Sequence, residues 1–504
     1  LLIIRIMTLE SIESKNYPPI ESHGIIGNML TTALVSIQGE INFMCYPHFD
    51  SPAIFCKLLD ANKGGFWNIK PICKEFKTKQ SYWPDTNVLQ TRFLMKSAVC
   101  TIVDYMPVIQ GKGMRWLVRK VKVIRGDVDF EMKCWPTFDF GRKTHTVKKT
   151  THGYLLASEG IELELLSYFP LFPKENGEID CKFSLKENES ATFVLKDPEQ
   201  DVDLFMFKDH NGSCRREEYL FMSTIDYWQK WLERCTYKGR WREIVERSAL
   251  VLKLLTFSPT GAIVAAPTCS LPEDLGGERN WDYRFTWIRD AAFTVYGLMR
   301  IGFTDEAKHF MDWIEARCSQ IDYEKCAKEG TMPLKIMYSI NGSEKIPEVS
   351  LPHLEGYRKS APVRIGNDAV NQKQLDIFGE MMDSVYLSNK YGSLVSYDFW
   401  THLHRIIEWV CDHWNETDEG IWEVRSGRQH FVYSKIMCWV AIDRGLRLAD
   451  RRSFPAPRER IGAFTQSYGS ESLDASTLIM SLVFFMAPND PRHIQTLENI
   501  LSST

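Results

Sequence analysis

The chain has 504 residues, of which 44% are apolar and 25% are charged, and its formal net charge at pH 7 is −4. This length exceeds the size at which one hydrophobic core usually stops growing, so we expect two domains. The small net charge, spread without large basic blocks, excludes a duplex-binding surface, and nucleic acid is not an expected partner.

The start of the chain and its cysteines indicate a compartment. Residues 1–7 are apolar apart from Arg5 and lack a basic region, an adequate apolar core and a cleavage site, so they do not read as a signal peptide. No apolar stretch approaches the ~20 residues that span a bilayer. The 13 cysteines are scattered without a Cys-x-x-Cys pair, which indicates neither a zinc site nor a disulfide framework. We therefore expect a cytoplasmic protein with reduced thiols and no membrane partner.

Between about residues 24 and 235, apolar and polar residues alternate with the period of strands. The segments 117–124 and 128–134 alternate on both sides of Gly126-Asp127, which predicts a β-hairpin. Shorter segments of the same kind follow at 154–156, 161–166, 181–185 and 192–195. Many short strands at such spacing predict a β-sandwich, which we place at residues 20–235.

Helical periodicity then replaces this alternation. The apolar residues of the run 241–255 fall on one helical stripe, formed by Ile244, Val245, Val251, Leu252 and Leu255. Further helices are expected at 290–300, 370–391, 397–414, 434–449 and 472–486. Successive helices with long loops containing glycine and proline predict α-hairpins arranged around a ring, in a domain at residues 236–504.

A cluster of aromatic and charged residues opens one of these helices. The segment 280–290 follows a glycine-rich loop and combines aromatic rings with two arginines and two aspartates. Aromatic rings stack on the apolar faces of sugars, while Arg289 and Asp290 would hydrogen-bond the hydroxyls. The alternative is a helix-capping aspartate with a surface ion pair.

A second cluster lies in the segment 417–425, where Glu423 follows Trp422. Hydrolysis of a glycosidic bond generally takes two carboxyl groups, one of which protonates the leaving oxygen. Contact with the indole and partial burial would raise the pKa of the Glu423 carboxyl, as a general acid at neutral pH requires. The alternative is a solvated glutamate in a loop between helices.

These clusters belong to longer stretches that closely resemble glycoside hydrolase family 15, the glucoamylases, glucodextranases and related trehalases. The resemblance runs through residues 260–291, 362–368, 374–383, 420–425, 433–439 and 464–475. Upstream, residues 26–42 and 47–53 are similar to the trehalase-like N-terminal domain of the same proteins. The resemblance covers nearly the whole chain, and it implies an N-terminal β-sandwich followed by an (α/α)6 toroid.

Carried over position by position, the resemblance implies roles for individual residues. Glu423 would be the general acid, and Arg289 and Asp290 would hold the hydroxyls of the glucosyl unit that is released. The substrate-binding residues as a set would be Tyr283, Trp287, Arg289, Asp290, Arg364 and Trp422. The implied reaction is inverting, exo-acting hydrolysis of α-glucosidic bonds, which needs neither metal nor organic cofactor.

The implied substrates are disaccharides or oligosaccharides, and glucose would be released from trehalose, maltose or the ends of α-glucans. The trehalase-like N-terminal segment and the absence of a secretion signal favour trehalose or short α-glucosides. The sequence does not indicate an oligomeric state.

One part of the family pattern has no match before Thr504. Family members carry the general base on a late loop far beyond the acid, whereas the late acids here, Glu471 and Asp474, lie in a different motif and are expected to cap or pack a helix. At usual helix lengths, residues 241–504 hold only about eight or nine helices. We therefore expect a toroid that is incomplete at its C-terminal end.

Two alternatives follow from the missing carboxylate. One is a sugar-binding remnant or an incomplete gene model. Because the base is missing, we expect the 504-residue chain to release no glucose from maltose or trehalose, whereas an extended chain would release it as the β-anomer. The other is a sugar phosphorylase, which would use phosphate in place of the base, although the motifs do not resemble those families.

Overall fold

The computed structural model describes residues 17–109, 111, 113–200, 215–424, 427–456, 483, 489, 490 and 494. The chain forms two compact units, each assembled from separate stretches. Unit 1 comprises residues 1–259, 266–284 and 348–366, and unit 2 comprises residues 260–265, 285–347 and 367–504. Glu471, Asp474 and, apart from Val483, the predicted helix at 472–486 lie outside the described residues.

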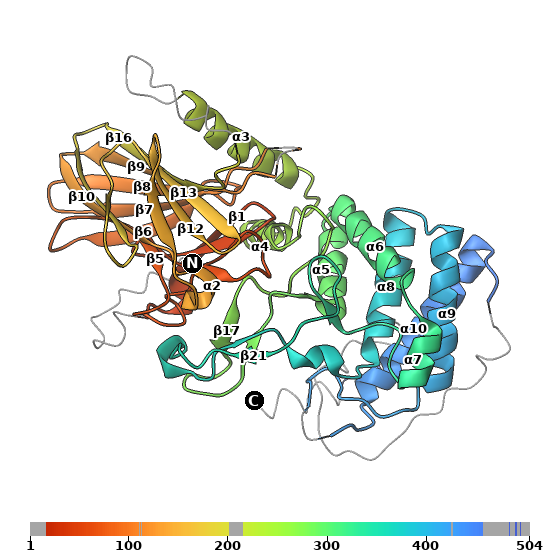
Figure 1. Ribbon diagram of the computed structural model, residues 1–504. Helices are drawn as coiled ribbons and strands as arrows, with labels where there is room; N and C mark the ends of the chain where they lie inside the picture. Colours follow the sequence, from red (N-terminus) through yellow and green to blue (C-terminus); the bar gives the residue numbers. More distant parts are fainter. Residues whose placement is uncertain are drawn as a thin grey trace. The chain divides into compact units, whose positions relative to one another are not determined.

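Two eight-stranded antiparallel sheets dominate unit 1 (Figure 1). The first sheet has the spatial order β1 (His23–Gly27), β2 (Thr32–Ser36), β3 (Glu40–Cys45), β5 (Phe66–Pro71), β10 (Val128–Trp135), β15 (Ile179–Leu185) and β14 (Phe172–Pro173), with β4 (Ala53–Phe55) paired to β3. The second has the order β11 (Thr146–Lys149), β12 (Gly153–Ser158), β13 (Ile161–Ser167), β16 (Ser190–Lys196), β9 (Trp116–Arg125), β8 (Val99–Tyr105), β7 (Leu89–Leu94) and β6 (Lys77–Tyr82).

The two sheets share one hydrophobic core. Trp67 and Phe130 of the first sheet lie in the same fully buried cluster as Phe93, Val121 and Phe193 of the second. Alternating side chains of a strand point to opposite faces, so each sheet turns one apolar face toward the other. The sandwich-like pair of N-terminal sheets that the alternation predicted is confirmed.

The predicted hairpin at 117–134 is wrong in its pairing. Both of its strands exist, as β9 and β10, but β9 pairs with β8 and β16 while β10 pairs with β5 and β15. The chain therefore crosses from one sheet to the other at Gly126, whose φ of +75° permits the sharp turn. Alternation requires only that one face of each strand be buried, and that condition holds equally for a hairpin and for a crossing between sheets.

In the described part of unit 1 the sheets are accompanied by the helices α2 (Phe138–Gly141), α3 (Arg215–Leu232) and α4 (Arg242–Leu254). Of the predicted stripe, Leu255 is buried, but Ile244 is 64% exposed and Val245, Val251 and Leu252 are only half-buried, so the buried face of α4 is shifted in phase. The buried face instead contains Glu246 with Ala249, Leu250 and Leu254. The Glu246 carboxylate accepts a hydrogen bond of 2.6 Å from Arg242. Because this buried residue is an acid, a search for apolar residues at helical spacing does not find the buried face.

Two later stretches of the chain also pack within unit 1. They contribute the short strands β17 (Cys269–Pro272), β18 (Asn280–Asp282), β21 (Val349–Ser350) and β22 (Arg364–Ile365), and the turn η2 (Tyr357–Lys359). Cys269, Leu351 and Val363 share a buried cluster with Phe43 and Cys45 of β3. Both stretches lie within the range 236–504 in which the sequence predicts the helical domain, and they pack within the unit that contains the sheets.

Unit 2 is helical. Its elements are β19 (Thr286–Trp287), α5 (Ile288–Arg300), α6 (Thr304–Cys318), α7 (Tyr323–Glu329), β20 (Met337–Tyr338), η3 (Asp368–Asn371), α8 (Asp376–Tyr391), α9 (Tyr397–His413) and α10 (Val432–Arg452). Helix α8 packs against both α5 and α10 (Figure 1). None of the described helices combines the length and apolarity needed to cross a membrane. The predicted boundary at 235/236 stays a prediction, as does the toroid that is incomplete at its C-terminal end.

A completely enclosed ion pair of unit 1 joins Arg119 on β9 to Asp104 on β8. Both side chains are completely buried, and the Arg119 Nε lies 2.8 Å from an Asp104 carboxylate oxygen. The guanidinium also donates to the backbone oxygens of Trp67 and Gly39, so one residue links both sheets.

We predict that Arg119→Ala lowers the free energy of unfolding by about 3–5 kcal/mol, because it leaves the Asp104 charge buried without its partner. Arg115→Ala is the matched control: Arg115 pairs with Asp197 at 3.0 Å but is 38% exposed, and its loss should cost less than about 1 kcal/mol. Urea denaturation followed by circular dichroism compares the two, and equal losses would contradict this account.

Candidate active site

Arg289 and Asp290 lie in the first turn of α5. Trp287, the residue before the helix, is in β19 and pairs with Met337 of β20, which fixes where the helix begins. The Arg289 side chain is only 11% exposed, whereas that of Asp290 is 46% exposed. The Arg289 guanidinium lies 5.7 Å from the centre of the Trp287 ring system, so three of the predicted residues form one group.

Glu423 belongs to the loop between α9 and α10, and the fold brings it to this group. Its Oε1 lies 3.5 Å from Nη2 of Arg289, although the two residues are 134 positions apart. The side chain is 23% exposed. Glu423 has a φ of +55°, in the left-handed region that residues with a Cβ avoid, and a turn beginning at Gly420 holds it there.

The environment of Glu423 in the structure differs in one respect from the environment that the sequence predicts. Trp422 is 62% exposed, so its indole ring is not part of a buried apolar pocket. One close neighbour of the Glu423 carboxylate is the Arg289 guanidinium, a positive charge that the sequence did not place there.

Tyr283 and Arg364 are the two predicted site residues that belong to unit 1. The Arg364 Nε lies 3.2 Å from a carboxylate oxygen of Glu348, and Nη1 donates to the backbone oxygen of Glu278 at 2.7 Å. The guanidinium also lies 4.7 Å from the centre of the Trp281 ring system. The backbone oxygen of Tyr283 accepts a hydrogen bond from Ala266.

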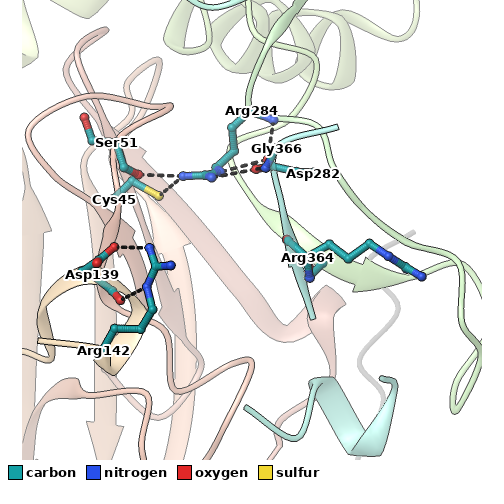
Figure 2. Close-up of polar contacts among 9 residues, drawn as sticks. Cys45, Ser51, Asp139, Arg142, Asp282, Arg284, Arg364 and Gly366 are labelled. Carbon is teal, nitrogen blue, oxygen red and sulfur yellow. Dashed lines mark hydrogen bonds and ion pairs between the residues drawn. The ribbon is translucent and has the colours of Figure 1, made fainter. Parts of the chain in front are cut away.

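A buried ion pair flanks Tyr283 in the sequence. The Arg284 guanidinium lies between Asp282 on one side and Cys45 and Ser51 on the other, while Arg364 extends away from this pair (Figure 2). Arg284 donates to Asp282 at 2.7 Å and to the Ser51 backbone oxygen at 2.6 Å. Asp282 also accepts from the Gly366 backbone at 3.0 Å. These contacts fix the segment that carries Tyr283 to the first sheet of unit 1.

Acidic and amide side chains around Arg289 were assigned no role from the sequence. Nη1 of Arg289 donates to Gln374 Oε1 at 2.7 Å and lies 3.2 Å from Asp376 Oδ2. Burial raises the pKa of Asp376, with the Arg289 charge opposing that shift. The sequence does contain these polar residues, at the start of the 374–383 motif. Nothing in a linear sequence, however, indicates that they contact Arg289.

A second buried acid lies one turn further along α8. Glu380 accepts a hydrogen bond from the hydroxyl of Tyr433 on α10. Burial raises the pKa of Glu380 from its ordinary value of 4.5 to about 8, despite this hydrogen bond. Its carboxyl group is therefore mostly protonated at neutral pH. In the described part of the chain no group of histidine, cysteine and acidic side chains has the arrangement of a metal site.

Comparison with known proteins agrees with these motifs. Residues 239–504 match the family described as Glycosyl hydrolases family 15, and residues 10–167 match that described as Trehalase-like, N-terminal. A protein named Trehalase from Mycobacterium tuberculosis is 34% identical, over 94% of this chain and 74% of its own length. Proteins of the same name from Thermoplasma volcanium and Mycolicibacterium smegmatis are 34% and 35% identical, over 96% and 94% of this chain and 79% and 76% of their own lengths.

The protonated Glu380 predicts a pH-dependent stability. The folded protein holds this proton more tightly than the unfolded chain, so the contribution of Glu380 is fully present below about pH 4.5 and is lost as the pH rises through about 8. The slope is at most about 1.4 kcal/mol per pH unit.

We expect the stability of the wild-type protein relative to Glu380→Gln to fall between pH 5 and pH 8, because the amide does not titrate. Urea unfolding at both pH values measures the difference. Glu243→Gln, which replaces an exposed acid of α4 outside the core, is the control and should not reproduce the difference. A difference that is the same at both pH values would show that Glu380 does not retain its proton.

Proposed function

The chain belongs to glycosyl hydrolases family 15 and is a glycoside hydrolase, and from this premise we propose that it hydrolyses trehalose with inversion of configuration. The three relatives described above are named Trehalase and align with nearly the whole of this chain, which favours trehalose over maltose and over the ends of α-glucans. The proposal includes an (α/α)6 toroid for the helical domain and a trehalase-like N-terminal domain.

The observation that carries the proposal is the 3.5 Å contact between Arg289 Nη2 and Glu423 Oε1. It joins two motifs from distant parts of the sequence, one suited to binding a sugar and the other to donating a proton. Glu423 would protonate the oxygen that links the two glucose units, and the bond to the anomeric carbon would break as water attacks the opposite face.

The remaining roles follow from the chemistry of each side chain. Arg289 and Asp290 would hold the hydroxyls of the glucosyl unit, since one donates and the other accepts hydrogen bonds. Trp287 and Trp422 would supply aromatic surface for the sugar faces. For Tyr283 and Arg364, which belong to unit 1, the substrate-binding role stays a prediction. The proposal assigns the acid, and the carboxylate that activates the water is left unassigned.

The stereochemistry of the products tests the mechanism. In α,α-trehalose both anomeric carbons have the α configuration, so an inverting hydrolysis releases one β-glucose from the attacked ring and one α-glucose as the leaving group. We expect proton NMR, recorded before mutarotation equilibrates the anomers, to show equal initial amounts of both. Formation of α-glucose alone would indicate retention and would overturn the inverting mechanism.

Substitution of the proposed acid tests its role. Glu423→Gln should lower kcat/KM for trehalose by about 100- to 10,000-fold, the range for loss of general acid catalysis. The loss should be much smaller with α-glucosyl fluoride, because fluoride departs with little help from a proton. Glu408→Gln is the control and should retain wild-type activity. Equal losses on both substrates would remove Glu423 from the acid role.

A further inference from the structure

We propose that Asp376 and Gln374 are positioning residues that orient the Arg289 guanidinium toward Glu423, and that they set the pH range in which Glu423 can donate its proton. The inference rests on the proposed function, because it takes Glu423 as the acid. It also gives a role to the 374–383 motif, whose polar side chains have no part in the mechanism as described so far.

The guanidinium of Arg289 is held from one side. Its Nη1 contacts both Gln374 Oε1, at 2.7 Å, and Asp376 Oδ2, at 3.2 Å. Both anchoring side chains are completely buried, whereas the Glu423 side chain is 23% exposed. A guanidinium is planar and rigid, so fixing Nη1 also fixes the directions of Nη2 and Nε. Those two nitrogens lie 3.5 Å from Glu423 and 3.8 Å from Asp290.

The loop that carries Glu423 is attached to the same anchor segment. The backbone N–H of Lys373 donates to the Glu419 carboxylate at 2.8 Å, and that of Glu419 donates to the Lys373 carbonyl at 2.9 Å. The backbone N–H of Leu375 donates to Asp418 Oδ2 at 3.0 Å. Residues 373–376 therefore hold both Arg289 and the 418–423 loop, so the distance between the arginine and the proposed acid is fixed through one short segment.

The net charge around the Glu423 carboxyl group matters for acid catalysis. A guanidinium beside a carboxyl group favours the ionised form, which cannot donate a proton. Burial alone would lower the pKa of Arg289, but Asp376 in the first place, and then Asp290 and Glu423, raise it. Asp376 therefore offsets much of the arginine charge. The 3.5 Å separation from Glu423 also exceeds the 2.7–2.9 Å of a charge-assisted hydrogen bond, which weakens that pull further.

Other ionisable groups lie around Arg289 and Asp376. They are Asp290 on α5, Glu380 on α8, Tyr433 and Cys438 on α10, and Asp418 and Glu423 from the loop before α10, with Lys373 and Lys435 near Asp418. Asp376 lies closer to the guanidinium than Asp290 or Glu423 does, and it is completely buried. Its negative charge is consequently the one least screened by water.

Removal and addition of charge at the anchor should have opposite effects. Asp376→Asn takes away a negative charge, so Glu423 would ionise more readily and the alkaline limb of the kcat/KM profile for trehalose should move down by about one pH unit. Activity on the alkaline side of the limb would then fall about tenfold. Gln374→Glu adds a carboxylate to the same nitrogen and should move the limb up by a similar amount.

The double variant Asp376→Asn with Gln374→Glu exchanges the two groups and keeps the total charge. It should return the alkaline limb close to its wild-type position, a rescue that a purely structural role would not produce. Asp383→Asn is the matched control on the same helix, because Asp383 pairs with Arg444 at 2.5 Å rather than with Arg289. It should leave the limb in place. Thermal unfolding confirms that each variant is folded before its profile is interpreted.

The outcomes separate the two proposals. Suppose that trehalose is cleaved and that Glu423→Gln is inactive. The positioning role alone is then overturned if the alkaline limbs of the folded single variants do not shift, or if they shift in the same direction. If the wild-type protein binds trehalose without cleaving it, the proposed function fails, and calorimetry decides the positioning role: tenfold weaker binding by folded Asp376→Asn supports it and unchanged binding overturns it. Absence of both binding and cleavage overturns both proposals.

Discussion

A buried guanidinium is stable only where carboxylates and carbonyl oxygens replace the water that its N–H groups lose. Arg119 and Arg284 in unit 1 meet this requirement within the fold, each with one aspartate and with backbone oxygens. Arg289 in unit 2 meets it through Asp376 and Gln374 but also faces Glu423, which is part exposed. Arg119 and Arg284 therefore have a structural role. Arg289 is in addition directed at Glu423, a carboxyl group that substrate can reach under the proposed function.

Helix α8 supports this arrangement through a row of acids spaced by one turn. Asp376 contacts Arg289 of α5, Glu380 contacts Tyr433 of α10, and Asp383 contacts Arg444 of α10. Three carboxyl groups on one helix face would repel one another if all were charged and unpaired. Here two have arginine partners and the middle one keeps its proton, so the helix can bury Asp376 and Glu380 and hold α5 and α10 at the same time.

The sequence predicted the period of each region and most of the helices and strands, because period depends on local geometry alone. It did not predict which strands pair, since β9 and β10 satisfy the same alternation in different sheets. At the site, the family resemblance selected Arg289 and Glu423, and the structure places them together. The exposure of Trp422 and the anchoring role of Asp376 could not be predicted, because both depend on contacts between residues far apart in the chain.

The distribution of the chain between its two units has a consequence for how such a protein can be altered. Because residues 260–265, 266–284, 285–347 and 348–366 alternate between unit 2 and unit 1, the polypeptide passes from one to the other five times. Domains joined by one linker can be exchanged by a single gene fusion, but here every single junction divides at least one of the two units. Exchange of one unit as a module would therefore need several simultaneous breakpoints.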